Sequence, residues 1–248
     1  MGARAPSDPP RARAFVGTSG WAYATWKPLF YPEGTKSANF LRYYATRLAT
    51  LEVNYTFNHL PTEKNIAGWK EATPGEFVFA LKASQQITHY RQLQDPATTL
   101  PLFFERARPL GERLGPVLFQ TPPWLKRDDD RLAMFLAELP SDVRCALEVR
   151  DPSWYSDEVY ELLRTRGVAL VHAEGERAPS PLETVGATAP FAYLRLRSEA
   201  GYGDAAVDAW AERLRPLLAR GSDVYAYFRH DDTGANALSA ERLRDALG

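Results

Sequence analysis

Several charged and polar side chains close short apolar runs, at spacings that would let them share one reaction centre. The run TLEVN contains Glu52 and Asn54, FVFALK ends at Lys82, and CALEVR contains Glu148 and Arg150. Side chains alternate between the two faces of a strand, so Glu52 and Asn54 share a face, as do Glu148 and Arg150. A carboxylate can transfer a proton, and ammonium or guanidinium groups can hold an anion. We therefore expect Glu52 and Glu148 to be catalytic and the two cations to bind substrate.

Other runs, and the loops that follow them, add polar and aromatic groups. PVLFQ ends at Gln120, and FAYLRLR places Tyr193, Arg195 and Arg197 on one face. Trp21 follows two small residues and could stack on a sugar or a base, and the glycines beside Tyr202 suit either an anion site or an ordinary turn. The residues expected to bind substrate are Ser19, Trp21, Asn54, Lys82, His89, Gln120, Arg150, Arg195, Arg197, Tyr202, His230 and Asp231.

The elements that must position these residues alternate regularly along the chain. Short strands are predicted at 14–18, 50–54, 77–82, 116–120, 144–149, 168–172, 191–196 and 223–228. Amphipathic helices are predicted at 37–49, 62–72, 99–114, 128–139, 157–166, 205–220 and 235–247, with at most a short helix at 180–189. This alternation predicts the α/β class and a single (β/α)8 TIM-type barrel of parallel strands over residues 14–248. Residues 1–13 are expected to be a disordered leader.

The helix boundaries carry their own chemical signals. Ser156 can cap the helix that opens at residue 157, and the acidic residues at 128–130 suit a helix N-terminus. Gly115, Gly167 and Gly221 follow predicted helices, where a left-handed turn is common.

In such a barrel the carboxyl ends of the strands form the active face. The second and fifth strands lie nearly opposite each other, so Glu52 and Glu148 are expected to face each other across the mouth. Two readings stay open. The charges could bind a ligand, or they could form an ion-pair network inside the barrel.

A metal site is an open possibility, although no metal or other cofactor is predicted outright. The candidate ligands for a divalent cation are Glu52, Glu148, His172 and Asp231, because carboxylate and imidazole groups suit Mg, Mn or Zn. No HExxH, P-loop or GxSxG motif occurs. The single cysteine, Cys145, is expected to be a buried structural thiol.

Composition limits the partners. The 30 basic and 31 acidic residues of the 248-residue chain give a net charge of -1, which argues against long nucleic acids and anionic membranes. No apolar run approaches the length of a membrane span. A small-molecule substrate and a cytoplasmic location are expected, and the oligomeric state is left open.

Several longer blocks resemble one family. GTSGWAYATWKPLFYPE, LEVNYTFNHLPT, LGPVLFQTPP, EVRDPSW and YFRHDDTGANA resemble the DUF72, or YecE-like, family over residues 15–243. The resemblance implies a TIM-type barrel without a settled activity. This chain departs from the family pattern at RLRS, which places Arg197 where histidine is usual, and at YFRHDD.

Three functions are compatible with these observations. The first is a hydrolase or isomerase that acts on a small anionic, phosphate- or sugar-containing substrate, with carboxylates as general acid and base. The second is a metal-dependent phosphoesterase or nuclease-like barrel. The third is a non-catalytic ligand-binding or partner protein.

Overall fold

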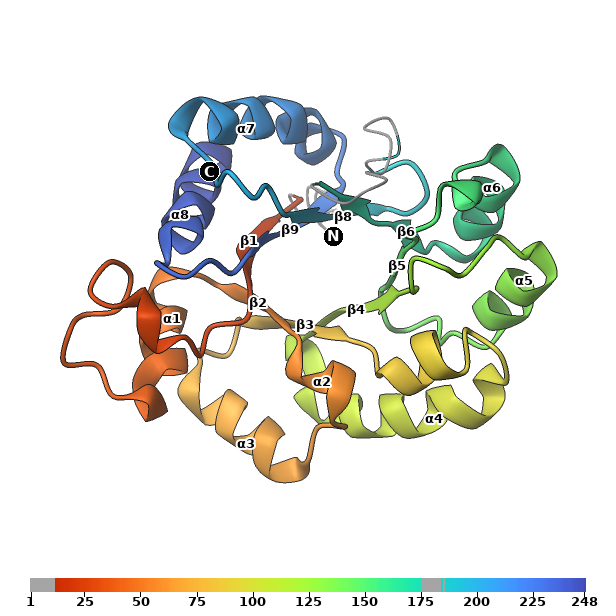
Figure 1. Cartoon of the computed structure of the whole chain (residues 1–248), viewed down its shortest axis with the longest axis horizontal. Helices are drawn as coiled ribbons and strands as arrows, with labels where there is room; N and C mark the ends of the chain where they lie inside the picture. The colour runs from red at the N-terminus through yellow and green to blue at the C-terminus, as the bar shows by residue number, and fades with distance from the viewer. Residues whose placement is uncertain (1–11, 175–183, 185) are drawn as a thin grey trace, which may run out of the picture.

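Parallel strands form a nearly closed barrel with helices around its outside (Figure 1). The computed structural model of the chain describes residues 12–174, 184 and 186–248. Its strands are β1 (Ala14–Ser19), β2 (Thr50–Val53), β3 (Val78–Lys82), β4 (Leu114–Gln120), β5 (Cys145–Glu148), β6 (Ala169–Leu170), β7 (His172–Ala173), β8 (Phe191–Leu196) and β9 (Asp223–Arg229). Every pairing is parallel, in the order β6-β5-β4-β3-β2-β1-β9-β8-β7. The predicted TIM-type barrel is therefore confirmed.

The sixth predicted strand is the one that differs from expectation. It is divided at Val171 into β6, which pairs with β5, and β7, which pairs with β8. The Val171 amide still donates to the Leu147 carbonyl at 2.9 Å, so residues 169–173 close the barrel between β5 and β8. Eight sequence segments thus supply the wall, as the alternation predicted.

The helices fall between the strands and cover the barrel from outside (Figure 1). They are α1 (Phe40–Arg47), α2 (Tyr55–Asn58), α3 (Glu63–Ala72), α4 (Pro96–Ala107), α5 (Asp129–Ala137), α6 (Asp157–Arg166), α7 (Asp204–Ala219) and α8 (Ala235–Leu247). Short helical turns η1 (Ala24–Trp26), η2 (Ser37–Asn39), η3 (Gln86–Tyr90), η4 (Arg108–Arg113) and η5 (Pro152–Trp154) lie in the connections.

The predicted helix ends are largely confirmed. The Ser156 hydroxyl accepts from the Val159 amide at the start of α6, and Gly167 ends that helix with a φ of 62°. Gly221 has a φ of 89° after α7. Gly115 is a correction: it lies inside β4, where a Cβ would come 2.6 Å from a methyl of Val78. It is required by close packing and not by a left-handed turn.

Strand alternation divides the core into two layers. The lumen is filled by side chains that include Phe15, Leu118, Phe191, Tyr193 and Tyr227, whereas residues of the opposite parity pack against the helices. Burying these apolar surfaces is the main source of the fold's stability. The lumen is therefore a packed core, and among the described residues its buried charges lie at the carboxyl end.

Two expectations fall partly outside the described residues. These are the leader up to residue 11 and half of the segment 180–189. Arg13 is described, and its backbone amide donates to the Asp223 carboxylate at 2.8 Å. No helix of the described chain is long and apolar enough to cross a membrane.

Candidate active site at the carboxyl end of the barrel

Two buried glutamates and one buried arginine form the centre of the barrel mouth. Glu52, from β2, and Glu148, from β5, are both 0% exposed, and Arg195, from β8, is 1% exposed. Arg195 donates to both oxygens of Glu52, through Nε at 3.0 Å and Nη2 at 2.7 Å. Its Nη1 donates to Oε2 of Glu148 at 2.7 Å. One guanidinium thus joins the two carboxylates that the sequence placed on opposite sides of the mouth.

Neutral side chains complete this Glu52–Arg195–Glu148 network. The Ser19 hydroxyl donates to Oε1 of Glu52 at 2.5 Å, and the Tyr193 hydroxyl donates to Oε2 at 2.8 Å. The Gln120 side chain donates to Oε1 of Glu148 at 2.8 Å. Each Glu52 oxygen therefore accepts two hydrogen bonds, whereas each Glu148 oxygen accepts one. Glu148 keeps more unused acceptor capacity than Glu52.

The network holds both carboxyl groups in the ionised form. Burial alone would raise the pKa of Glu148, but the charges of Arg195 and Arg197 and the Gln120 hydrogen bond lower that pKa to about 2. Burial is opposed in the same way at Glu52, where Arg195 lowers the pKa below its usual value. At neutral pH both groups can accept a proton but hold none to donate.

Lys82 lies beside this network at the end of β3. Its ammonium group is 4.0 Å from the centre of the Phe57 ring, and it forms no hydrogen bond or ion pair within the described part of the chain. Burial, followed by the charge of Arg195, lowers the pKa of Lys82 to about 8, because the nearby Glu148 and Glu52 charges offset these effects only in part. Lys82 is therefore a half-buried amine that changes charge near neutral pH.

The backbone around Lys82 is held firmly. The Thr56 hydroxyl donates to the Lys82 carbonyl at 2.7 Å and lies 3.0 Å from the Val53 carbonyl, which ties α2 to the ends of β2 and β3. Asn54, at the start of α2, is half-buried, and its side chain forms no hydrogen bond with any other described residue. Asn54 and Lys82 thus offer polar atoms that a ligand could use.

Aromatic rings lead from Lys82 toward the surface. The His89 ring is 4.9 Å from the Phe57 ring and 6.2 Å from the ring of Trp124, which is 62% exposed. Burial and the charges of Lys82 and Arg150 lower the pKa of His89, so its imidazole is neutral at pH 7. Phe57, in α2, and Trp124, after β4, were not among the predicted binding residues, because strand alternation assigns no position to residues outside the strands.

The remaining predicted residues lie around this centre at different depths. The charge of Arg197 acts on both network carboxylates and on Lys82, and Arg150 acts on His89, so both arginines belong to the mouth. Trp21 is half-buried and packs against the outer core.

The loops after β8 and β9 form the opposite rim. The Tyr202 hydroxyl donates to the Glu174 carboxylate and accepts from the Ser198 amide. The exposed His230 stacks on Tyr23 at 4.6 Å. A hollow of about 380 Å³ opens between these loops and includes His230 among its lining residues. Tyr202 and His230 thus line the rim, away from the buried network.

Two of the four candidate metal ligands, His172 and Asp231, do not join the two glutamates at the mouth. The His172 ring packs 5.4 Å from the Trp210 ring of α7, so it faces the helix layer and not the lumen. The Asp231 carboxylate accepts from the backbone amides of Thr233, Ala235 and Asn236, which caps the start of α8. The expectation that His172 and Asp231 are metal ligands is therefore wrong. Within the described ranges, no group of three or more His, Cys, Asp or Glu side chains could hold a metal ion.

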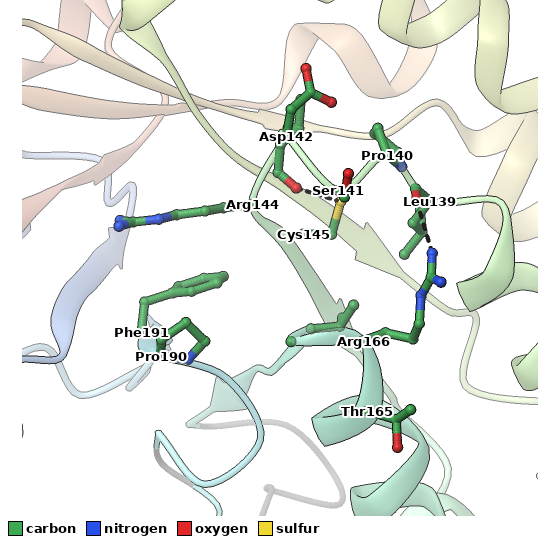
Figure 2. Close-up of a pocket in the computed structure, with 13 residues that line it drawn as sticks. Leu139, Pro140, Ser141, Asp142, Arg144, Cys145, Thr165, Arg166, Pro190 and Phe191 are labelled. Carbon is green, nitrogen blue, oxygen red and sulfur yellow. Dashed lines mark hydrogen bonds between the residues drawn. The ribbon is translucent and has the colours of Figure 1, made fainter.

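A second hollow, of about 400 Å³, lies at the amino ends of β5, β6 and β8 (Figure 2). Its charged groups are engaged with the protein. Arg144 pairs with Asp223 at 2.6 Å, Asp142 pairs with Arg108 at 2.5 Å, and Arg166 donates to backbone carbonyls. The active sites of TIM-barrel enzymes lie at the opposite, carboxyl end of the strands. We therefore place the candidate site at the mouth, where Lys82 and the network lie.

Known proteins with the same architecture support this reading of the fold. The family model described as "Protein of unknown function DUF72" matches residues 15–248. The UPF0759 protein YunF of Bacillus subtilis is 23% identical over 269 residues, covering 94% of each chain. The UPF0759 protein YecE of Escherichia coli K12 is 28% identical over 155 residues, covering 62% of this chain and 54% of that protein. The crystal structure of a DUF72 family protein from Thermotoga maritima superimposes with a TM-score of 0.82 and 27% identity, covering 95% of this chain and 99% of that one. The chain is therefore a member of the DUF72 family.

Proposed function

We propose that this protein is an enzyme, a hydrolase or an isomerase, that acts on a small anionic, hydroxyl-bearing substrate at the carboxyl end of the barrel. The observation that carries the proposal is Lys82. A half-buried ammonium without a hydrogen-bond partner among the described residues is costly to keep in a folded protein. Such a cost is typical of a group kept for binding or catalysis.

The charge of the mouth favours an anionic substrate. Arg197 and Lys82 lie beside the network, Arg150 acts on the nearby His89, and Arg195 already neutralises part of the charge of the two glutamates. In this proposal Arg150 and Arg197 attract the anionic group. Lys82 lies at the reacting end of the substrate.

Glu148 is the better of the two predicted proton-transfer groups. It is ionised at neutral pH and has acceptor capacity left, whereas Glu52 already accepts four hydrogen bonds. Glu148 would therefore act first as a general base. Glu52 would hold Arg195 in place as a positioning residue, and Asn54 and Gln120 would orient substrate hydroxyls.

The first test is binding of inorganic phosphate. Its affinity is measured by thermal shift or by calorimetry, at low and at high salt. We expect phosphate to bind, and binding to weaken at high salt, because surface and mouth charges are screened. Arg197→Gln should weaken it at least about tenfold, since a charge-assisted hydrogen bond contributes roughly 1.5–3 kcal/mol. Arg106→Gln is the matched control, because Arg106 is exposed on α4, outside the barrel mouth. Equal binding by both variants would contradict an anion site at the mouth.

The second test is turnover of a panel of phosphorylated and carboxylated sugars. Asn54→Ala should reduce kcat/KM for any sugar that is turned over, and Glu148→Gln should reduce kcat while binding persists. Phosphate binding without turnover of any member of the panel would favour the non-catalytic binding protein and count against the enzyme.

A further inference from the structure

Lys82 differs from the chain's other lysines in its surroundings. The sequence contains six lysines, and the other five are Lys27, Lys36, Lys64, Lys70 and Lys126. Four of these are exposed, and Lys27 lies over the Phe40 ring outside the barrel. Lys82 is the one that projects from the end of a barrel strand toward two buried carboxylates and a buried arginine.

The position of Lys82 suits a nucleophile. An amine attacks only in its neutral form, and enzymes favour that form by placing the lysine against an apolar surface or beside another cation. Burial of the side chain and the neighbouring Arg195 supply these features, and the Phe57 ring, 4.0 Å from Nζ, holds the end of the side chain in place. The nitrogen forms no hydrogen bond to any described residue that would hold its lone pair or its protons. The Thr56 hydrogen bond to the Lys82 carbonyl fixes the backbone from which the side chain extends.

From this geometry we infer that Lys82 is a covalent catalyst that forms an imine with the carbonyl group of the substrate. The inference rests on the proposed function and narrows its substrate class to aldehydes and ketones that carry an anionic group. It favours an isomerase, or another reaction at a carbon next to a carbonyl, over a hydrolase.

The step is balanced without an oxidant or a reductant. The Nζ lone pair forms a bond to the carbonyl carbon, and the C=O π electrons move to the oxygen, which takes up a proton as the nitrogen loses one. The nitrogen lone pair of the resulting carbinolamine then forms the C=N bond while the C–O bond breaks, and the departing hydroxyl takes a proton from solvent and leaves as water. The product is an iminium ion that withdraws electrons from the neighbouring carbon, whose proton Glu148 could accept.

The test uses glycolaldehyde phosphate as the probe and sodium borohydride to reduce any imine to a stable amine. The full-length protein is treated at pH 7.5 and digested, and the labelled lysines are quantified by mass spectrometry. We expect Lys82 to be labelled at least about tenfold faster than Lys64, because its lower pKa leaves far more of the amine neutral. Lys64 is an exposed lysine of the same chain and serves as the internal control.

Added inorganic phosphate separates this inference from the proposed function. If both hold, phosphate slows labelling of Lys82 and leaves Lys64 unchanged. If phosphate binds but Lys82 is labelled no faster than Lys64, the covalent role is refuted and the anion site stands. If Lys82 is labelled rapidly and phosphate neither binds nor protects it, the covalent role stands and the anion site is refuted.

Discussion

Replacing Lys82 with methionine should make the protein more stable at neutral pH. Methionine keeps most of the length of the side chain and its apolar stem, but it removes a charge that burial and Arg195 both disfavour. Few substitutions of a polar residue are expected to stabilise a fold. The prediction therefore tests directly whether Lys82 is retained at a cost in stability.

The magnitude follows from the pKa. Lowering the pKa of Lys82 from 10.5 to about 8 corresponds to a cost of about 3 kcal/mol for keeping the amine charged in the folded state. Losing the cation–π contact with Phe57 subtracts roughly 1 kcal/mol from the gain expected on removing the charge. The partial exposure of Lys82 reduces that gain further. We expect Lys82→Met to raise the free energy of unfolding by about 1–2 kcal/mol at pH 7.

The pH dependence gives the sharper result. Below pH 8 both the folded and the unfolded chain hold the Lys82 proton, so the folded protein bears the whole cost. Between pH 8 and pH 10.5 the unfolded chain binds more protons at this group, and the stability of the wild type rises with pH relative to the variant. The advantage of Lys82→Met should therefore shrink across this window.

Urea unfolding at several pH values from 7 to 10.5 measures the difference between the two proteins. Other titrating groups are common to both and cancel in that difference. Lys64→Met, on the exposed face of α3, should show little change at any pH. A Lys82→Met protein that is less stable than the wild type at pH 7, or an advantage that does not depend on pH, would refute the reasoning.

Two further substitutions or treatments test the buried groups. Glu148→Gln should lower the free energy of unfolding by about 3–5 kcal/mol at pH 7, because Arg195 loses one of its two buried counter-ions. The depressed pKa of Glu148 means that this contribution is present at neutral pH and is lost as pH falls toward 2, so the urea midpoints of wild type and variant should converge in acid. Cys145 should not react with a thiol reagent such as Ellman's reagent until the protein unfolds, because burial raises its pKa to about 12, and rapid reaction in the native state would contradict the buried placement.

Strand alternation was sufficient to predict which side chains would meet at the mouth. Glu52, Gln120, Glu148 and Arg195 were all assigned to the lumen from parity, and the structure joins them by hydrogen bonds. Alternation fixes the face of a strand but not the distance across a barrel. The sequence therefore left open whether Arg195 binds a ligand or pairs internally, and the structure places it between the two glutamates.

The expectations that failed depended on local backbone geometry. His172 was placed near the mouth because it ends an apolar run, but parity about Val171 turns its ring toward Trp210. Asp231 follows β9, yet short aspartate side chains often bind nearby backbone amides, and here they cap α8. The orientation of His172 follows from strand alternation once Val171 is assigned to the lumen, whereas the Asp231 cap has no periodic signature in the sequence.

The network and Lys82 are best understood together. Two buried carboxylates close to a lysine would ordinarily raise its pKa and hold it as a cation. Burial lowers the pKa of Lys82 most, and Arg195, which lies between those carboxylates, offsets part of their charge and adds its own repulsion, so the pKa is about 8. The same arginine keeps Glu148 ionised and able to accept a proton. Burial and one buried guanidinium together leave a base and a partly neutral amine at the same barrel mouth, an arrangement that an isolated structural ion pair would not require.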